Sequence, residues 1–309
     1  MTKFRYDIGL SEKYPFGTEL EFVGVYLSEV SKILEENNFP ARFLLNHKNN
    51  GLLSFDEWYI DTDSTVTIEK NNDYFGGELS SRILTDTKVC WQELEDLCAY
   101  LKELKAYVDG TCSNHVWINL TSLENEKYFF EVFSKIIAIF ETDIRLFYMG
   151  DKYLIRKTSF ENARLISGHL LEYINQIDFN DPDYFYNFRF GGSVGVFSRG
   201  DGINLQEYLK RKMIEIRYAN GSINPVTIQN NINFSLKLID AIIRGLFDIE
   251  RLTRIIETEK DTIYSNFLFN TPDYKKFEWL AKTIATSAYD EDAFMTQYER
   301  VLKNNKNTY

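Results

Sequence analysis

Alternating polar and apolar positions mark four short segments of the chain as strands with two different faces. In residues 17–22 (GTELEF), Glu19 and Glu21 share one face of the expected strand, while Leu20 and Phe22 share the other. Three later segments repeat this pattern, with these polar residues on one face: Glu78, Ser80 and Arg82 in 75–84; His115, Trp117 and Asn119 in 114–120; Glu215 and Arg217 in 213–218. The pattern predicts four strands, each with one chemically active face.

Apolar residues at helical spacing predict helices between and after these strands. Ser28, Thr87 and either Thr121 or Ser122 are candidate N-caps, and Asn224 followed by Pro225 is a favoured helix start. One predicted helix follows residue 28, and a second runs from residue 87 until Asp109-Gly110. Three more are predicted from residue 121 or 122 to about 147, over about 162–177, and from 225 to about 249. Residues beyond 250 are also helical in pattern. We therefore expect one domain over residues 1–249 and a helical C-terminal extension over residues 250–309.

The predicted strands have a common chemistry if they belong to one antiparallel sheet whose apolar face is covered by helices. Their polar faces then form one surface that carries Glu19, Glu21, Glu78, His115, Glu215 and Arg217. Several carboxylates with one imidazole suit Mg²⁺ or Mn²⁺ better than a structural zinc ion. An arginine beside them indicates a phosphate whose charge is shared with the metal ions. Taken alone, Glu19-Leu20-Glu21 is also compatible with the solvated face of an edge strand.

Composition narrows the classes of function. The 309-residue chain has a net charge of −11 and no basic stripe, which argues against a nucleic-acid partner. Its three cysteines lack metal-ligand spacing and suit a reducing compartment. Neither a secretory leader nor a stretch long enough to span a membrane is visible. We expect a cytoplasmic protein without a membrane partner.

Five short motifs resemble the amidoligase family, carboxylate–amine ligases of the glutamine synthetase and glutamate–cysteine ligase superfamily. They occur in the family's order over roughly residues 16–245, as FGTELEF (16–22), WYIDTDS (58–64), GELSS (77–81), NHV (114–116) and IEIR (214–217). The resemblance implies an α+β fold in which a curved antiparallel sheet carries helices on one face, as in the glutamine synthetase catalytic fold. It also implies an ATP- and Mg²⁺- (or Mn²⁺-) dependent ligase that joins a small-molecule or peptide carboxylate to an amine through an acyl phosphate.

The same resemblance implies roles for individual residues. Glu19, Glu21, Glu78, His115 and Glu215 match metal ligands, and Arg217 matches the arginine that stabilises the transferred phosphoryl group. Asp63 is a candidate for orienting or deprotonating the amine, with a turn residue as the alternative.

Two positions depart from the family pattern. Trp117 replaces the second histidine of a His-x-His strand and is a candidate for stacking on adenine or substrate. Arg82 replaces a proline and is a candidate for binding phosphate or the substrate carboxylate, or for a surface ion pair. Arg164, Arg189 and Arg199 are further candidate cationic contacts, whereas His47 and His169 are expected to be structural or exposed.

The sequence is also compatible with two other functions. A phosphotransferase on the same scaffold requires similar metal geometry, and a non-catalytic binding protein retains the fold without turnover. Trp117 motivates the second of these, but the paired Glu-x-Glu and Glu-x-Arg strands speak against it because carboxylates without a metal ion are costly to bury.

Overall fold

The computed structural model of the protein describes residues 3–10, 12–44, 56–70, 73–150, 163–179 and 200–305. Its centre is an eight-stranded sheet in the order β2-β3-β5-β1-β6-β8-β7, with β4 paired to β5. The strands are β1 Phe16–Tyr26, β2 Ala41–Phe43, β3 Trp58–Asp61, β4 Ile68–Lys70, β5 Asp73–Ser80, β6 Ser113–Asn119, β7 Ile203–Asn204 and β8 Met213–Asn220. All pairs are antiparallel except β2 with β3. The four strands predicted from alternation are thus neighbours, in the order β5-β1-β6-β8.

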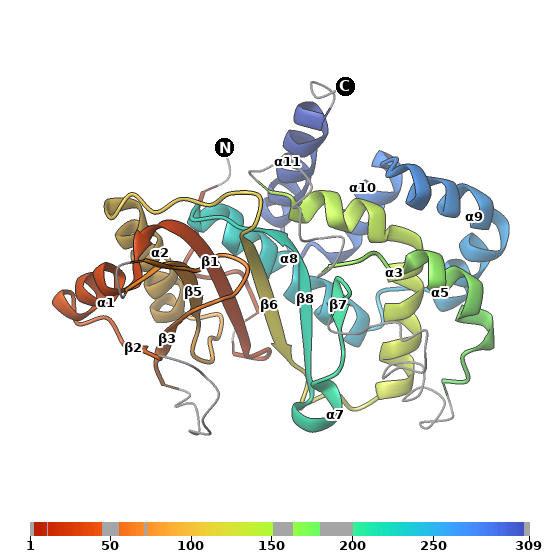
Figure 1. Ribbon diagram of the computed structural model, residues 1–309. Coiled ribbons are helices and arrows are strands. Elements are labelled where there is room, and N and C mark those ends of the chain that lie inside the picture. Colours follow the sequence, from red (N-terminus) through yellow and green to blue (C-terminus); the bar gives the residue numbers. More distant parts are fainter. Residues whose placement is uncertain are drawn as a thin grey trace.

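The apolar face of the sheet is covered by helices (Figure 1). The described helices are α1 Leu27–Glu36, α2 Lys88–Glu103, α3 Glu126–Tyr148, α5 Ser167–Tyr173, the 3-10 turn η1 Ile174–Gln176, α7 Tyr208–Arg211, α8 Pro225–Ile243, α9 Ile249–Phe269, α10 Tyr274–Ile284 and α11 Ala288–Asn305. Trp91 of α2 packs on Phe16 of β1, with ring centroids 5.5 Å apart. Across the strands, Leu20 lies opposite Leu79 and Val116 lies opposite Ile216. The protein is therefore a mixed α/β structure built on an open sheet.

Several helix boundaries confirm the sequence prediction, and others differ from it. Thr87 caps α2 and Asn224 caps α8, whose first residue is Pro225. Helix α1 begins at Leu27 without a side-chain cap from Ser28, and α3 is capped by Asn125 instead of Thr121 or Ser122. Helix α2 stops at Glu103, before Asp109-Gly110, because Lys105 adopts a positive φ of 62° that cannot continue a helix.

Residues 249–305 form mainly helix, as the periodicity predicts, and α9–α11 pack beside α3 and α8 (Figure 1). Phe277 of α10 stacks on Tyr298 of α11 and contacts Phe147 of α3. One continuous apolar cluster joins these helices to the sheet. A division at residue 249 stays a prediction.

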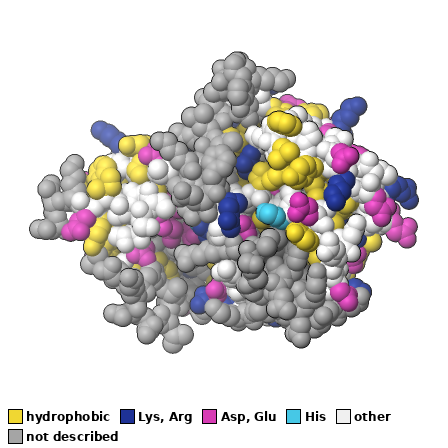
Figure 2. All heavy atoms as spheres, turned by 45° about the vertical axis from the view of Figure 1, so that its right-hand side comes forward, with side chains coloured by type: hydrophobic (Ala, Val, Ile, Leu, Met, Phe, Trp, Pro, Cys, Tyr) yellow, Lys and Arg dark blue, Asp and Glu magenta, His cyan; other side chains and the backbone are white. Residues whose placement is uncertain are grey.

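Two further observations concern the polarity of the helices and the distribution of charge on the surface. Within the described ranges, every helix is too short or too polar to cross a lipid bilayer. On the face turned forward in Figure 2, Lys and Arg side chains are dispersed among acidic and apolar ones instead of forming a stripe.

Candidate functional site

The register of the central strands places the predicted site residues on one face of the sheet. Glu19 of β1 lies opposite His115 of β6, and Glu21 of β1 lies opposite Glu78 of β5. Glu215 of β8 lies opposite Trp117 of β6. Directly opposed residues in an antiparallel pair point to the same side. The polar face that we predicted from alternation is therefore a contiguous surface across four strands.

The first group on this surface, the imidazole cluster, consists of Glu19, His115 and Glu215. Nδ1 of His115 lies 2.6 Å from Oε2 of Glu19 and 3.3 Å from Oε1 of Glu215. His115 and Glu215 are buried, while Glu19 is partly exposed. Two hydrogen-bond acceptors repel each other at 2.6 Å, so this contact requires a proton on Nδ1 or a cation between the groups.

Glu215 has two further partners. Nη1 of Arg217 donates to its Oε1 at 2.5 Å, and Nδ2 of Asn204 in β7 donates to its Oε2 at 2.7 Å. Burial raises the pKa of Glu215, although the charges of His115 and Arg217 oppose this shift. A second cation near Glu215 would favour its ionised form.

The second group, the carboxylate cluster, consists of Glu21, Asp63 and Glu78. One carboxylate oxygen from each lies within 4.8 Å of the others. Burial, together with the charges of Glu19, Glu21 and Asp63, raises the pKa of Glu78 well above its usual value; Oγ of Ser80, which donates to Glu78 at 2.7 Å, opposes the shift. Three acidic groups this close need protons or cations to offset their repulsion.

Both clusters have the spacing and the donor types of a divalent-cation site. Oxygen ligands at about 2.1–2.6 Å from an ion lie up to about 4.2–5.2 Å apart when they occupy opposite sides of it. The ligand atoms of Glu19, His115 and Glu215 also lie within 4.8 Å of one another. The carboxylate cluster has only oxygen donors, which suits Mg²⁺ or Mn²⁺, and the imidazole of the other cluster is compatible with the same ions. The five predicted metal ligands thus fall into two adjacent groups, with Asp63 as a sixth candidate.

Asp63 follows β3 in a turn. Its Oδ1 accepts a hydrogen bond from the backbone N–H of Thr65 at 2.7 Å, and its own N–H donates to Oγ1 of Thr67 at 2.9 Å. Asp63 is therefore a turn residue, as the alternative predicted. Its carboxylate also belongs to the carboxylate cluster. Its predicted action on the amine stays a prediction.

Ser113 and Asn204 belong to the site although we did not predict them from the sequence. Ser113 begins β6 two residues before His115, so alternation puts it on the same face, and it contacts both clusters. This signal was available in the sequence. Asn204 contacts Glu215 only because the two-residue strand β7 pairs with β8, and so short a strand has no periodicity to detect.

Two predicted cofactor-binding residues have partners within the protein. Nε1 of Trp117 donates to Oε1 of Glu19 at 2.9 Å. The strand predicted over residues 75–84 ends at Ser80, so Arg82 does not continue the polar face. Instead, its guanidinium donates to both carboxylate oxygens of Glu93 in α2, at 2.9 and 2.8 Å. Glu93 also accepts from the buried indole of Trp58, on the helix-covered side of the sheet. Arg82 therefore forms an ion pair, as the alternative predicted, but this pair is half-buried and does not lie at the surface.

The remaining candidates lie apart from the two clusters or outside the described residues. Arg164 pairs with Asp201, with 2.9 Å between Nη2 and Oδ1. His169 is exposed on α5. His47, Arg189 and Arg199 lie outside the described residues.

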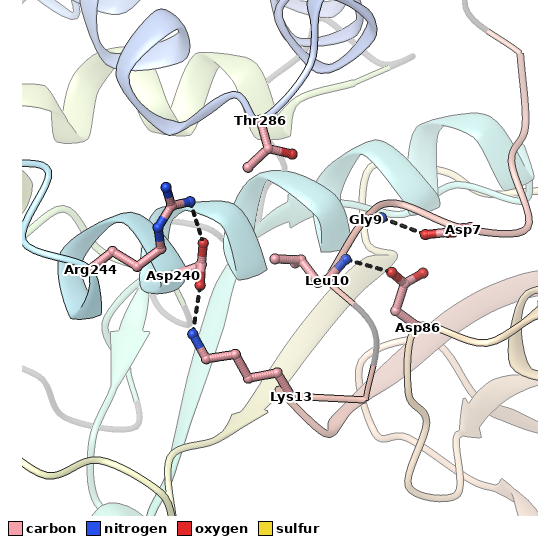
Figure 3. A pocket seen from close by; sticks show the side chains of 8 residues that line it. All are labelled: Asp7, Gly9, Leu10, Lys13, Asp86, Asp240, Arg244 and Thr286. Carbon is pink, nitrogen blue, oxygen red and sulfur yellow. Dashed lines mark hydrogen bonds and ion pairs between the residues drawn. The ribbon is translucent and has the colours of Figure 1, made fainter.

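A pocket of about 530 Å³ opens elsewhere, between the N-terminal segment, α8 and the connection from α10 to α11 (Figure 3). At its wall, Asp240 accepts hydrogen bonds from Lys13 at 3.0 Å and from Arg244 at 3.2 Å. None of the predicted site residues lines it. We therefore assign the candidate site to the polar face of the sheet.

Fold and site together define a mixed α/β protein with two adjacent candidate cation sites and an arginine on one face of its sheet. Residues 12–148 match the family model described as "putative amidoligase enzyme". This match confirms the resemblance to the amidoligase family over β1 to α3, and it indicates a ligase-type enzyme. It includes Glu19, Glu21, Asp63, Glu78 and His115 and ends before Glu215 and Arg217. A comparison with curated proteins finds no significant match.

Proposed function

We propose that this protein is an ATP- and Mg²⁺-dependent carboxylate–amine ligase that forms an amide bond through an acyl phosphate, on a glutamine synthetase-like catalytic sheet. The observation that supports the proposal is the adjacency of the imidazole cluster and the carboxylate cluster, with Arg217 beside Glu215. The similarity of residues 12–148 to amidoligases favours this reaction among those that use such a site.

The proposed reaction has two steps. An oxygen of the substrate carboxylate forms a bond to the γ-phosphorus of ATP while the bond to ADP breaks. The amine nitrogen then forms a bond to the acyl carbon, inorganic phosphate leaves, and the amine loses a proton. Divalent ions, when bound, neutralise charge on the phosphate oxygens and align them for in-line transfer.

The residues of this chain contribute binding, orientation and charge. Glu19, His115 and Glu215 would hold one ion, while Glu21, Asp63 and Glu78 would hold another. The guanidinium of Arg217 donates to Glu215 and lies on the face where negative charge develops on the phosphoryl group. Asp63 is the candidate acceptor for the amine proton, since its carboxylate is partly exposed at the edge of the carboxylate cluster.

The test uses purified protein with Mg²⁺ and ATP, a panel of carboxylates and amines, and measurement of ADP, phosphate and amide product. Mg²⁺ with a non-hydrolysable ATP analogue should raise the melting temperature. Glu21→Gln should abolish both effects, whereas Glu35→Gln, at an exposed site on α1, should change neither. A stable phosphorylated product without amine consumption would indicate that the protein is a phosphotransferase and not a ligase. No stabilisation by any of several nucleotides with Mg²⁺ would contradict both.

A further inference from the structure

Ser113 lies between the two clusters and is bonded to both. It is the first residue of β6 and only 2% exposed. Its backbone N–H donates to Oε2 of Glu21 at 2.7 Å, and its Oγ lies 2.5 Å from Oε1 of the same carboxylate. The same Oγ lies 3.0 Å from Nε2 of His115. One buried side chain thus contacts a candidate ligand of each ion.

The number of protons on these groups determines the direction of the hydrogen bonds. A serine hydroxyl has one proton to donate, and an ionised carboxylate can only accept. The Ser113 proton therefore points to Oε1 of Glu21. A lone pair of Oγ remains for Nε2 of His115, so this nitrogen must be the one that donates.

We propose that Ser113 is a positioning residue, whose hydroxyl accepts the Nε2 proton of His115 and donates its own proton to Glu21. This relay holds the imidazole with Nδ1 toward Glu19 and Glu215, where a bound ion would take its lone pair and a proton occupies it when the ion is absent. It also fixes the orientation of the Glu21 carboxylate in the neighbouring cluster. The inference rests on the proposed function, because it assigns Nδ1 to a bound divalent ion.

The geometry explains why an apolar side chain at this position would be harmful to metal binding. Without the hydroxyl, Nε2–H of His115 loses the hydrogen bond that Oγ of the buried Ser113 accepts. Moving the proton to Nδ1 gives it a partner in Glu19, 2.6 Å away, but blocks the lone pair that faces the candidate ion. Groups that orient a metal-binding histidine in this way typically change metal affinity by about 10- to 100-fold when they are removed.

A matched pair of variants separates the effect of the Ser113 hydroxyl from the effect of side-chain volume. Ser113→Thr keeps the hydroxyl and adds a methyl group, whereas Ser113→Val has nearly the same volume without the hydroxyl. Mn²⁺ affinity is measured by electron paramagnetic resonance of the free ion, and folding is checked by circular dichroism. We expect Ser113→Val to bind Mn²⁺ about 10- to 100-fold more weakly than Ser113→Thr. Equal affinities in the two variants would overturn the proposal. If the added methyl group prevents folding, Ser113→Ala is compared with the wild type instead.

A spectroscopic measurement keeps this inference distinct from the proposed function. The chain has three histidines, so ¹⁵N spectra of histidine-labelled protein can be assigned with His115→Gln. The wild type should carry a proton on Nε2 of His115 with Mg²⁺ present or absent. An unprotonated Nε2 would contradict the relay. A wild type that binds no Mn²⁺ but has this protonated Nε2 would contradict the proposed function and leave the hydrogen-bond relay established.

Discussion

Nδ1 of His115 lies 2.6 Å from Oε2 of Glu19 across the β1–β6 pair, on the face opposite the hydrophobic core. We interpret this contact as part of a cation site because Glu215 also approaches the same nitrogen. His115→Ala is expected to remove stabilisation by Mg²⁺ and nucleotide, while the metal-free melting temperature changes by only a few degrees. Differential scanning fluorimetry measures both quantities. His169→Ala, on the exposed face of α5, is the matched control. A collapse of the metal-free melting temperature would show instead that His115 is structural.

Trp117 presents an aromatic ring on the polar face and also contacts Glu19, a candidate metal ligand. Its indole N–H donates to the Glu19 oxygen that His115 does not contact. Trp117→Phe keeps an aromatic ring but removes the donor. Because a hydrogen bond to a charged group contributes about 1.5–3 kcal/mol, we expect Mn²⁺ affinity to fall by about tenfold or more. Isothermal titration calorimetry of Mn²⁺, and of nucleotide with Mg²⁺, tests this. Unchanged Mn²⁺ affinity with weaker nucleotide binding would favour stacking as the only role of Trp117.

Glu78 is expected to be a source of instability in the metal-free protein. Two unit charges 4 Å apart repel by about 4 kcal/mol at an effective dielectric constant of 20, and Glu78 escapes part of this cost by binding a proton. Glu78→Gln should therefore raise the free energy of unfolding by about 1–2 kcal/mol without metal. The gain should grow with pH, because the wild-type carboxyl loses its proton whereas the amide remains neutral.

Urea unfolding in the presence of a chelator, at pH 7 and pH 8.5, measures the effect of Glu78→Gln. Glu35→Gln removes an exposed carboxylate and should leave the free energy of unfolding nearly unchanged. Destabilisation by Glu78→Gln at both pH values would contradict repulsion within the carboxylate cluster.

Asp143 in α3 makes the packing of the C-terminal helices dependent on pH. It accepts hydrogen bonds from the hydroxyl of Tyr298 and from the N–H of Asp273, and burial raises its pKa from 3.8 to about 7. The folded protein therefore binds this proton more tightly than the unfolded chain does. The contribution of Asp143 to stability is fully present below about pH 4 and is lost as the pH rises toward 7.

Asp143→Asn keeps an acceptor for both donors but has no proton to lose. Between pH 5 and pH 8, the wild type should lose a few kcal/mol of unfolding free energy relative to this variant. Denaturant unfolding across this range measures the difference. Asp292→Asn, on the exposed face of α11, should parallel the wild type. If the unfolding free energies of Asp143→Asn and the wild type change in parallel with pH, a raised pKa of Asp143 is contradicted.

The periodicity of the sequence was sufficient for the central elements. Strict alternation around Glu19, His115 and Glu215 identified β1, β6 and β8, since a strand with one buried face must alternate. The N-caps Thr87 and Asn224 were predictable because the capping hydrogen bond is local. The position of Arg82 was predicted wrongly because the regular ladder of β5 ends at Ser80 and Leu84 pairs with Phe16 one residue out of the register that Glu19 and Ser80 set. Alternation in the sequence does not reveal such a shift.

By itself, the sequence determined which side chains share a face of each strand, because that relationship depends only on the backbone geometry of neighbouring residues. It also determined the likeness to amidoligases, which depends on the order of short motifs. Only the tertiary structure decided how strands distant in sequence pair, and thus which carboxylates lie close together. The division into two clusters, the position of Ser113 between them and the partner of Arg82 all result from contacts between residues far apart in the chain. Local propensity does not encode such contacts.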